Sequence, residues 1–193
     1  MSIIRDPSSG KAVNVSDDGQ LLTQGEAQTP EHYTSHTHGQ VFQVRGEATV
    51  SSGTTQILHV SNNSSSKKLT IFALEIHIVD AAGGTALPNA SSYFEIGFGT
   101  SYTSGGTLTG IPVNLNRSSG NTADTTSYEG DPTVGGTFLP IDKFFPTAEG
   151  AASHRDYLKQ GAIILGQDDT VSIRYVGDQT AGLAYASFVF IQD

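Results

Sequence analysis

From residue 41 onward, apolar residues alternate with polar ones along short segments, the pattern of β-strands that bury one face. Residues 41–50 and 54–60 predict two such strands. Residues 69–80, LTIFALEIHIVD, carry the clearest alternation, and we expect one face of this strand to be buried and the other to be half covered. The face expected to be buried consists of Thr70, Phe72, Leu74, Ile76 and Ile78.

The rest of the chain continues this pattern. Strands are expected within residues 91–102 and 111–115, on both sides of the Asp-rich turn in residues 162–177, and in the alternating terminal segment 181–193. About eight short strands, separated by Gly, Ser and Asn turns, predict an all-β fold, an antiparallel β-sandwich of jelly-roll-like type.

Three segments between the strands lack a clear alternation. Residues 116–136 are mostly polar and are expected to form a long loop, a kind of segment that often has a function. Residues 137–145 predict either a strand pair or an irregular apolar plug. Residues 151–161 predict a single helical turn, since nearby glycines limit its length.

Residues 1–40 hold few side chains that could pack. Turn sequences such as RDPSSGK and SDDGQ separate only brief apolar pieces. A segment so poor in apolar residues cannot offset its ordering entropy alone, so it is either disordered or an arm that orders against another surface. We therefore divide the chain into an extended N-terminal arm, 1–40, and a β-sandwich domain, 41–193.

Composition narrows the classes of function. The 193 residues carry a formal net charge of −9, which repels phosphate backbones and argues against binding to nucleic acid. The chain has no cysteine, so disulfides and thiolate metal sites are excluded. No segment approaches the ~20 apolar residues of a membrane helix, and no membrane partner is expected.

No motif in the sequence indicates catalysis. There is no phosphate-binding glycine loop, no nucleophile elbow and no thiol nucleophile, so we expect neither an enzyme nor a cofactor. Acidic pairs occur only in glycine-containing turns, where we expect the carboxylates to cap and bend the backbone. These pairs are Asp17 with Asp18, Glu129 with Asp131, and Asp168 with Asp169.

Half of the histidines lie in residues 31–40, EHYTSHTHGQ. His36 and His38 are two positions apart, so in an extended segment both project to the same side. Two imidazoles are too few for a stable metal site, but three copies around a three-fold axis would supply an octahedral set. The alternative is a solvated junction between arm and sandwich. His59 and His77 lie inside predicted strands and are expected to be half buried.

Three phrases carry a resemblance to a family. IIRDPSSGKAVNVSDDGQL at residues 3–21 resembles the start of small virion structural proteins of tailed bacteriophages, in which a turn-rich segment precedes a β-sandwich. IPVNLNRSSGNTAD at 111–124 and GAIILGQDDTVSIRYVG at 161–177 are similar to other recurring pieces of these proteins. The resemblance touches both ends of the chain and its middle loop.

The resemblance implies a non-enzymatic virion protein, of the capsid decoration (cement) or head-fibre type. We expect it to bind the major capsid protein outside a phage head, to form a homotrimer around a three-fold axis, and to reside on virions assembled in the host cytoplasm. The alternative is a tail or fibre module that binds a receptor or glycan through residues 116–136 and the tyrosines. The arm residues expected to contact the capsid, in part by strand addition, are Ile3, Ile4, Pro7, Val13, Val15, Leu21 and Leu22.

Overall fold

The chain divides into two compact units, Met1–Pro30 and Glu31–Asp193. The computed structural model describes strands at 3–5, 12–15 and 21–22 in the first unit and residues 35, 38–50, 52–80, 92–145, 152–177 and 182–193 in the second. In the first unit, at 79–80 and at 152–162, only the backbone is described.

The first unit contains a small antiparallel sheet of three strands in the order β1-β2-β3. Its strands are β1 (Ile3–Arg5), β2 (Ala12–Val15) and β3 (Leu21–Leu22). The backbone register pairs Ile4 with Val13 and Val15 with Leu21. Six of the seven predicted arm residues therefore fall in these strands, and Pro7 lies outside the described residues.

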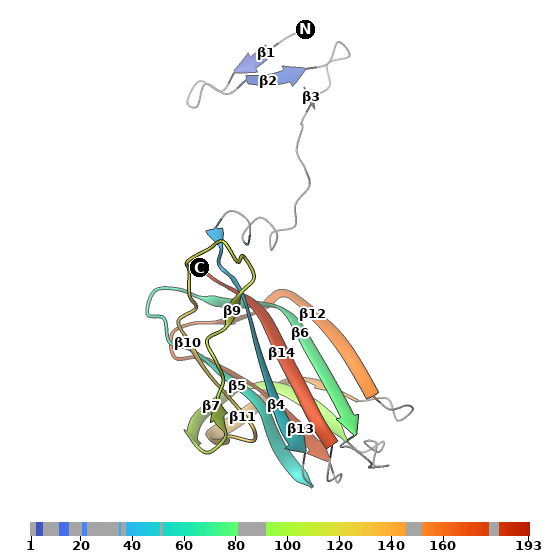
Figure 1. Ribbon diagram of the computed structural model, residues 1–193. Helices are drawn as coiled ribbons and strands as arrows, with labels where there is room; N and C mark the ends of the chain where they lie inside the picture. Colours follow the sequence, from blue (N-terminus) through green and yellow to red (C-terminus); the bar gives the residue numbers. More distant parts are fainter. Residues whose placement is uncertain are drawn as a thin grey trace. The chain divides into compact units, whose positions relative to one another are not determined.

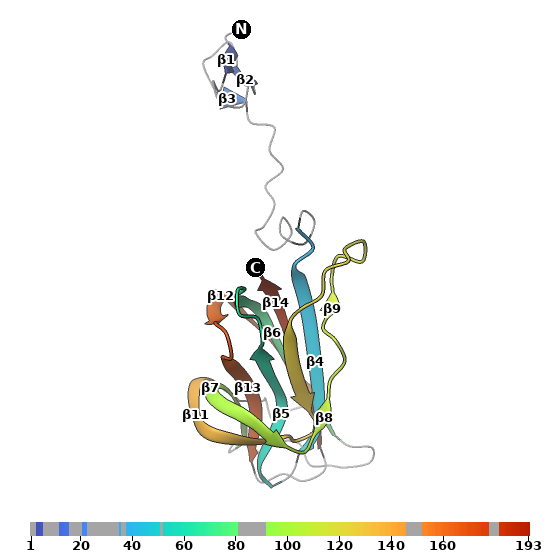
Figure 2. The same ribbon diagram turned by 90° about the vertical axis from the view of Figure 1, so that its left-hand side faces the viewer.

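The second unit is all-β and consists of two antiparallel sheets (Figures 1 and 2). The five-stranded sheet has the order β12-β6-β14-β4-β9, and the six-stranded sheet the order β11-β7-β13-β5-β10-β8. The five-stranded sheet comprises β12 (Ala152–Leu165), β6 (Leu69–Asp80), β14 (Gly182–Gln192), β4 (Val41–Val50) and β9 (Val113–Asn114). The six-stranded sheet comprises β11 (Thr133–Phe144), β7 (Tyr93–Ser104), β13 (Thr170–Gly177), β5 (Gly53–Asn62), β10 (Thr125–Glu129) and β8 (Thr107–Leu108).

One apolar core includes side chains from both sheets. Phe42 and Phe190 lie in the five-stranded sheet with ring centroids 5.7 Å apart. Phe94 and Tyr175 lie in the six-stranded sheet, 5.5 Å apart in an edge-to-face arrangement. Full burial of each such ring stabilises the fold by about 1.5–3 kcal/mol, which makes this core the main source of stability. The predicted all-β, sandwich-like fold is thus confirmed at the level of two packed antiparallel sheets.

Strand β6 contains a β-bulge that changes which residues are buried. Ile71 pairs with Phe190 whereas Ala73 pairs with Val189, so Phe72 is an extra residue between them. An extra residue reverses the alternation, because side chains along a strand have a period of two. The prediction was therefore correct only after the bulge, where Leu74, Ile76 and Ile78 are buried; before it, Leu69 and Ile71 are buried while Thr70 is not.

Two of the segments without alternation form strands instead. The predicted loop at 116–136 contains β10 and the start of β11, and the predicted helical turn at 151–161 lies in β12. The loop prediction is confirmed for residues 116–124 and wrong from residue 125 onward, and the helical turn is wrong. Strand pairing explains both outcomes, because β10 pairs along its length with β5, and residues 152–158 of β12 pair with β6. An isolated helical turn has no such source of stability. Among the described residues, no helix is long and apolar enough to span a bilayer.

Candidate functional site

The junction predicted at residues 31–40 is held by a set of asparagine side chains, which we name the asparagine clasp (Asn114, Asn116 and Asn121). Asn114 Nδ2 donates a hydrogen bond to the carbonyl of Gly39 at 2.8 Å, and Asn121 Nδ2 donates to the carbonyl of His38 at 2.7 Å. Amide side chains thus satisfy the backbone acceptors of His38 and Gly39, just before β4 begins.

Glycine is required at position 39 of this junction. Gly39 has φ of +58°, and a Cβ built there would lie 2.2 Å from Ser119 Oγ. A further clasp residue, Asn116, donates from Nδ2 to the carbonyl of Ser35 at 2.8 Å. The phrase NRSSGNTAD therefore has a structural explanation, since its polar side chains fix the backbone that leads into β4.

The predicted metal residues are described only in part. His38 is exposed, and His36 lies outside the described residues. No group of three or more His, Asp or Glu side chains within the described part of the chain could hold a metal ion. A site formed by three copies of His36 and His38 stays a prediction.

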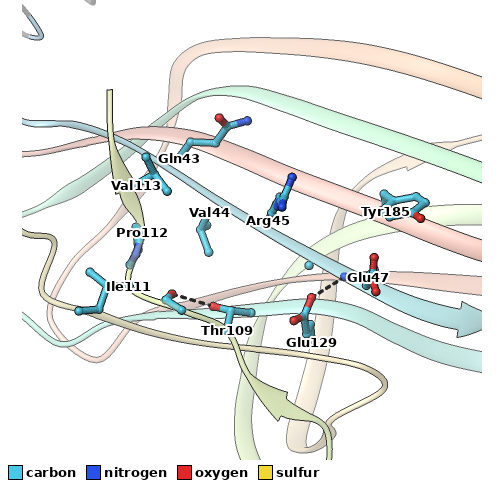
Figure 3. Close-up of a pocket in the computed structure, with 12 residues that line it drawn as sticks. Gln43, Val44, Arg45, Glu47, Thr109, Ile111, Pro112, Val113, Glu129 and Tyr185 are labelled. Carbon is cyan, nitrogen blue, oxygen red and sulfur yellow. Dashed lines mark hydrogen bonds between the residues drawn. The ribbon is translucent and has the colours of Figure 1, made fainter. Parts of the chain in front are cut away.

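A groove lies between the outer face of β4 and residues 109–113, and Figure 3 shows the side chains that line it. Its volume is about 510 Å³. Arg45 and Glu47 line it from β4, and Glu129 lines it from β10. The Glu47 amide donates to Glu129 Oε2 at 2.8 Å, so this carboxylate is held at the groove by the backbone.

A second hollow of about 330 Å³ continues the first across β14 and β6, since Arg45 and Tyr185 line both. Its other polar lining includes Glu75 and His77, and the His77 and Tyr185 rings lie 6.3 Å apart. The sheet register explains the cluster, because Glu47, Tyr185 and His77 are cross-strand neighbours in one row. The surface offers hydrogen-bonding groups of both charges and one ring that a ligand could stack on.

The tyrosines that were predicted to bind a glycan differ in their burial and contacts. Tyr175 is fully buried, and its hydroxyl donates to Ser92 Oγ at 2.9 Å. Tyr102 stacks on Tyr128, with centroids 3.6 Å apart, and Tyr93 lies beneath Lys143 Nζ at 3.3 Å. Tyr157 is described only by its backbone, and Tyr185 is 37% exposed in the groove. The prediction that Tyr175 can stack on a sugar is wrong, and Tyr185 is the best-placed candidate.

His59 lies next to serine hydroxyls, an arrangement that resembles a base beside a nucleophile. Its Nδ1 lies 2.8 Å from Ser172 Oγ, which in turn lies 2.8 Å from Thr100 Oγ1. His59 and Ser172 are both 0% exposed, and burial lowers the pKa of His59 to about 4. A reacting group needs access to substrate, so this buried chain is structural. His59 was predicted to be half buried and is completely buried.

The acidic pairs that the structure describes hold backbone amides. Asp131 Oδ1 accepts from the Gln56 amide at 2.7 Å, and Asp169 Oδ2 accepts from the Gly166 amide at 2.8 Å. Asp131 and Asp168 have positive φ values of 64° and 60°, a conformation that Asp tolerates in turns. The predicted capping role is confirmed for these turns, and Asp17 and Asp18 lie outside the described residues.

Two strips of exposed apolar side chains lie at different edges of the second unit. The β8–β9 strip follows residues 108–115, and the β11 strip follows residues 139–145. The β8–β9 strip consists of Leu108, Ile111, Val113 and Leu115, which are 61%, 75%, 52% and 44% exposed. The β11 strip consists of Leu139, Ile141 and Phe145, which are 56%, 39% and 53% exposed.

In comparisons with known proteins, no family model matches the chain, and no curated protein matches it. Tyr185 had been among the tyrosines predicted from the sequence to bind a glycan, but the groove residues Arg45 and Glu47 had not been selected. A signal was present in the alternation of QVRGE, which places charged residues on the outer face of β4. What the sequence alone could not supply was the approach of Tyr185, some 140 positions away, which only the sheet register provides.

Proposed function

We propose that this protein is a non-enzymatic virion structural protein of a tailed bacteriophage, a capsid decoration or cement protein. It binds the major capsid protein on the outside of the head through its N-terminal arm, and it forms a homotrimer around a three-fold axis. The arm residues, the trimer and the location on the capsid surface all belong to this proposal.

The observation that carries the proposal is the division of the chain. Met1–Pro30 is a compact unit of its own, and its strands have only three, four and two residues. Sheets this small are marginally stable by themselves in water. A partner surface that adds a strand to this sheet or covers it would supply the missing stability, which is how a capsid-binding arm works.

We further propose that the second unit is a jelly roll. In support, the long strands β4, β5, β6 and β7 alternate between the two sheets, and so do β11, β12, β13 and β14. Such an alternation of strands between two packed sheets is typical of a jelly roll. The burial of His59 with Ser172, and the use of Asp131 and Asp169 by backbone amides, support a role without catalysis.

The proposal is tested by removing residues 1–30, which leaves the carbonyls bound by the asparagine clasp in place. We expect the truncated chain to keep its fold and oligomeric state and to lose binding to phage heads. The measurement is co-sedimentation with purified heads that lack this protein, alongside circular dichroism and light scattering. The control is the full chain with Ser66→Asp in the exposed turn at 63–68. Undiminished binding by the truncated chain would contradict the proposal.

A second candidate function is a receptor- or glycan-binding module. The observation that favours it is the groove with Tyr185, Arg45 and Glu47, because binding sites combine a few polar groups with a ring. A glycan array separates the two functions. Specific binding that Tyr185→Ala abolishes, with no binding to heads, would favour this candidate over cement.

A further inference from the structure

We propose that the β8–β9 strip and the β11 strip are the two halves of one head-to-tail contact, in which the β11 strip of one copy docks on the β8–β9 strip of the next. This inference deepens the trimer of the proposed function and rests on that part of it. The occupant of each strip is therefore a second copy of this chain.

The positions of the strips indicate a contact between unlike surfaces. In the six-stranded sheet, β11 is the first strand and β8 the last, so the strips lie at opposite edges (Figure 2). A two-fold dimer needs one patch that is complementary to itself, whereas unlike patches on opposite sides generate a ring or a filament. Single exposed apolar residues are normal on a protein surface, but here they are grouped into two strips, and grouped apolar residues often mark a contact with another protein.

Shape and charge favour the pairing of these two strips. Ile111 and Val113 line the groove of about 510 Å³, which also contains Glu47 and Glu129 and one cation, Arg45. The β11 strip provides Phe145, whose ring packs against Tyr93 at 5.9 Å and is still 53% exposed. The neighbouring Lys143 Nζ lies 5.6 Å from the centroid of the Phe145 ring. An apolar ring beside an ammonium group is complementary to a groove that combines apolar side chains with two carboxylates, which outnumber its one guanidinium.

The edges themselves favour contact through side chains over strand addition. In β11 the register shifts between Gly136 and Leu139 and again between Pro140 and Asp142. Bulges and a proline in an edge strand block the pairing of a further strand. The bulge at Ile141 adds a residue without a partner. The opposite edge strand of this sheet, β8, has only two residues, and so does β9 at the edge of the five-stranded sheet; both are too short for an extended ladder.

The experiment uses two full-length variants, Val113→Asp for the β8–β9 strip and Phe145→Asp for the β11 strip. Each variant has lost one half of the contact, so each alone is expected to run as a monomer in light scattering, while the parent chain runs at three times its 20.3 kDa mass. Mixed in equal amounts, the variants retain one intact pair of strips. The mixture is expected to form dimers that do not grow further.

Ser66→Asp is the matched control, because it adds the same charge at an exposed residue that belongs to neither strip. If a variant fails to fold by circular dichroism, the milder Val113→Ser or Phe145→Ser replaces it. The inference is overturned by a monomeric parent chain, by variants that assemble like the parent, or by a mixture that stays monomeric. It is also overturned if only one variant dissociates, since that outcome indicates a contact between like strips.

Failure of this inference and failure of the proposed function give different results. A parent trimer that neither variant disrupts removes the inference but leaves binding to heads untouched. Conversely, the expected mixing result in a chain that does not co-sediment with heads supports the inference and removes the capsid role.

Discussion

The outer face of the six-stranded sheet is covered by the chain itself, whereas the outer face of the five-stranded sheet is open. His59 and Ser172 alternate with core residues and so point away from the core, yet both are fully buried. Arg45, Glu47 and Glu75 occupy equivalent outward positions in the five-stranded sheet and are exposed. The same alternation therefore gives a second buried layer on one sheet and a ligand-accessible surface on the other.

Part of the cover over the six-stranded sheet comes from β11. The Phe138 ring lies where a side chain at Gly97 would be, 2.5 Å from a Cβ built there. Arg174 lies over the Phe138 ring, with its Cζ 3.7 Å from the centroid, and its Nη2 lies 2.7 Å from Glu95 Oε2. The polar residues below this cover are structural, so binding is to be sought on the five-stranded sheet and at the edges.

Acidification should destabilise the buried layer on the six-stranded sheet, and we expect this to be the largest of the three effects. Burial lowers the pKa of His59 from 6.5 to about 4, so the unfolded chain binds the extra proton first as the pH falls. The contribution of neutral His59 to the free energy of unfolding is fully present above pH 6.5, and about 3 kcal/mol of it should be lost as the pH drops to about 4. Urea unfolding at several pH values measures this loss. In His59→Asn the slope in this window should shrink, and an unchanged slope would refute the assignment to His59.

Filling the space beneath the cover should have the next largest effect. Gly97→Ala places a methyl group against the Phe138 ring and 2.6 Å from the Leu139 carbonyl oxygen. The cost of such overpacking is about 2 kcal/mol. The matched control is Gly120→Ala, where a Cβ meets nothing within 4 Å. Thermal unfolding of both variants measures the difference, and equal melting temperatures would show that Phe138 does not cover the sheet tightly.

The smallest expected effect is the difference in stability between two serine-to-alanine variants, one on each sheet. Ser172→Ala removes the partner of His59 and Thr100 inside the covered layer, and should cost about 1–2 kcal/mol because buried polar groups lose a hydrogen bond. Ser187 in the five-stranded sheet is 8% exposed, and Ser187→Ala removes one long hydrogen bond, 3.4 Å from Gln43 Nε2 to Ser187 Oγ, so it should cost only about 0.5 kcal/mol. Chemical unfolding measures both values. Equal costs would mean that the two outer faces do not differ energetically.

The sequence predicted strands and their buried faces correctly where the alternation within one strand is regular. Alternation identified the strands at 41–50 and 181–193, because their inner positions are apolar along the full length. It failed at Phe72, where a bulge reverses the alternation, and at residues 152–162, which form a strand through pairing with β6. The groove could not be predicted from alternation, because it forms between β4 and residues 109–113, which are distant in the sequence. The burial of His59 could not be predicted either, because it depends on other parts of the chain that cover the outer face of the sheet.

The asparagine clasp also affects how tension reaches the sheets. If a bound partner pulls on the first unit, the load arrives at residues 35–39 before it reaches β4. There three side-chain amides hold the backbone carbonyls of Ser35, His38 and Gly39. These bonds share the strain, so the ten-residue β4 is shielded from being peeled off the sheet until the clasp opens.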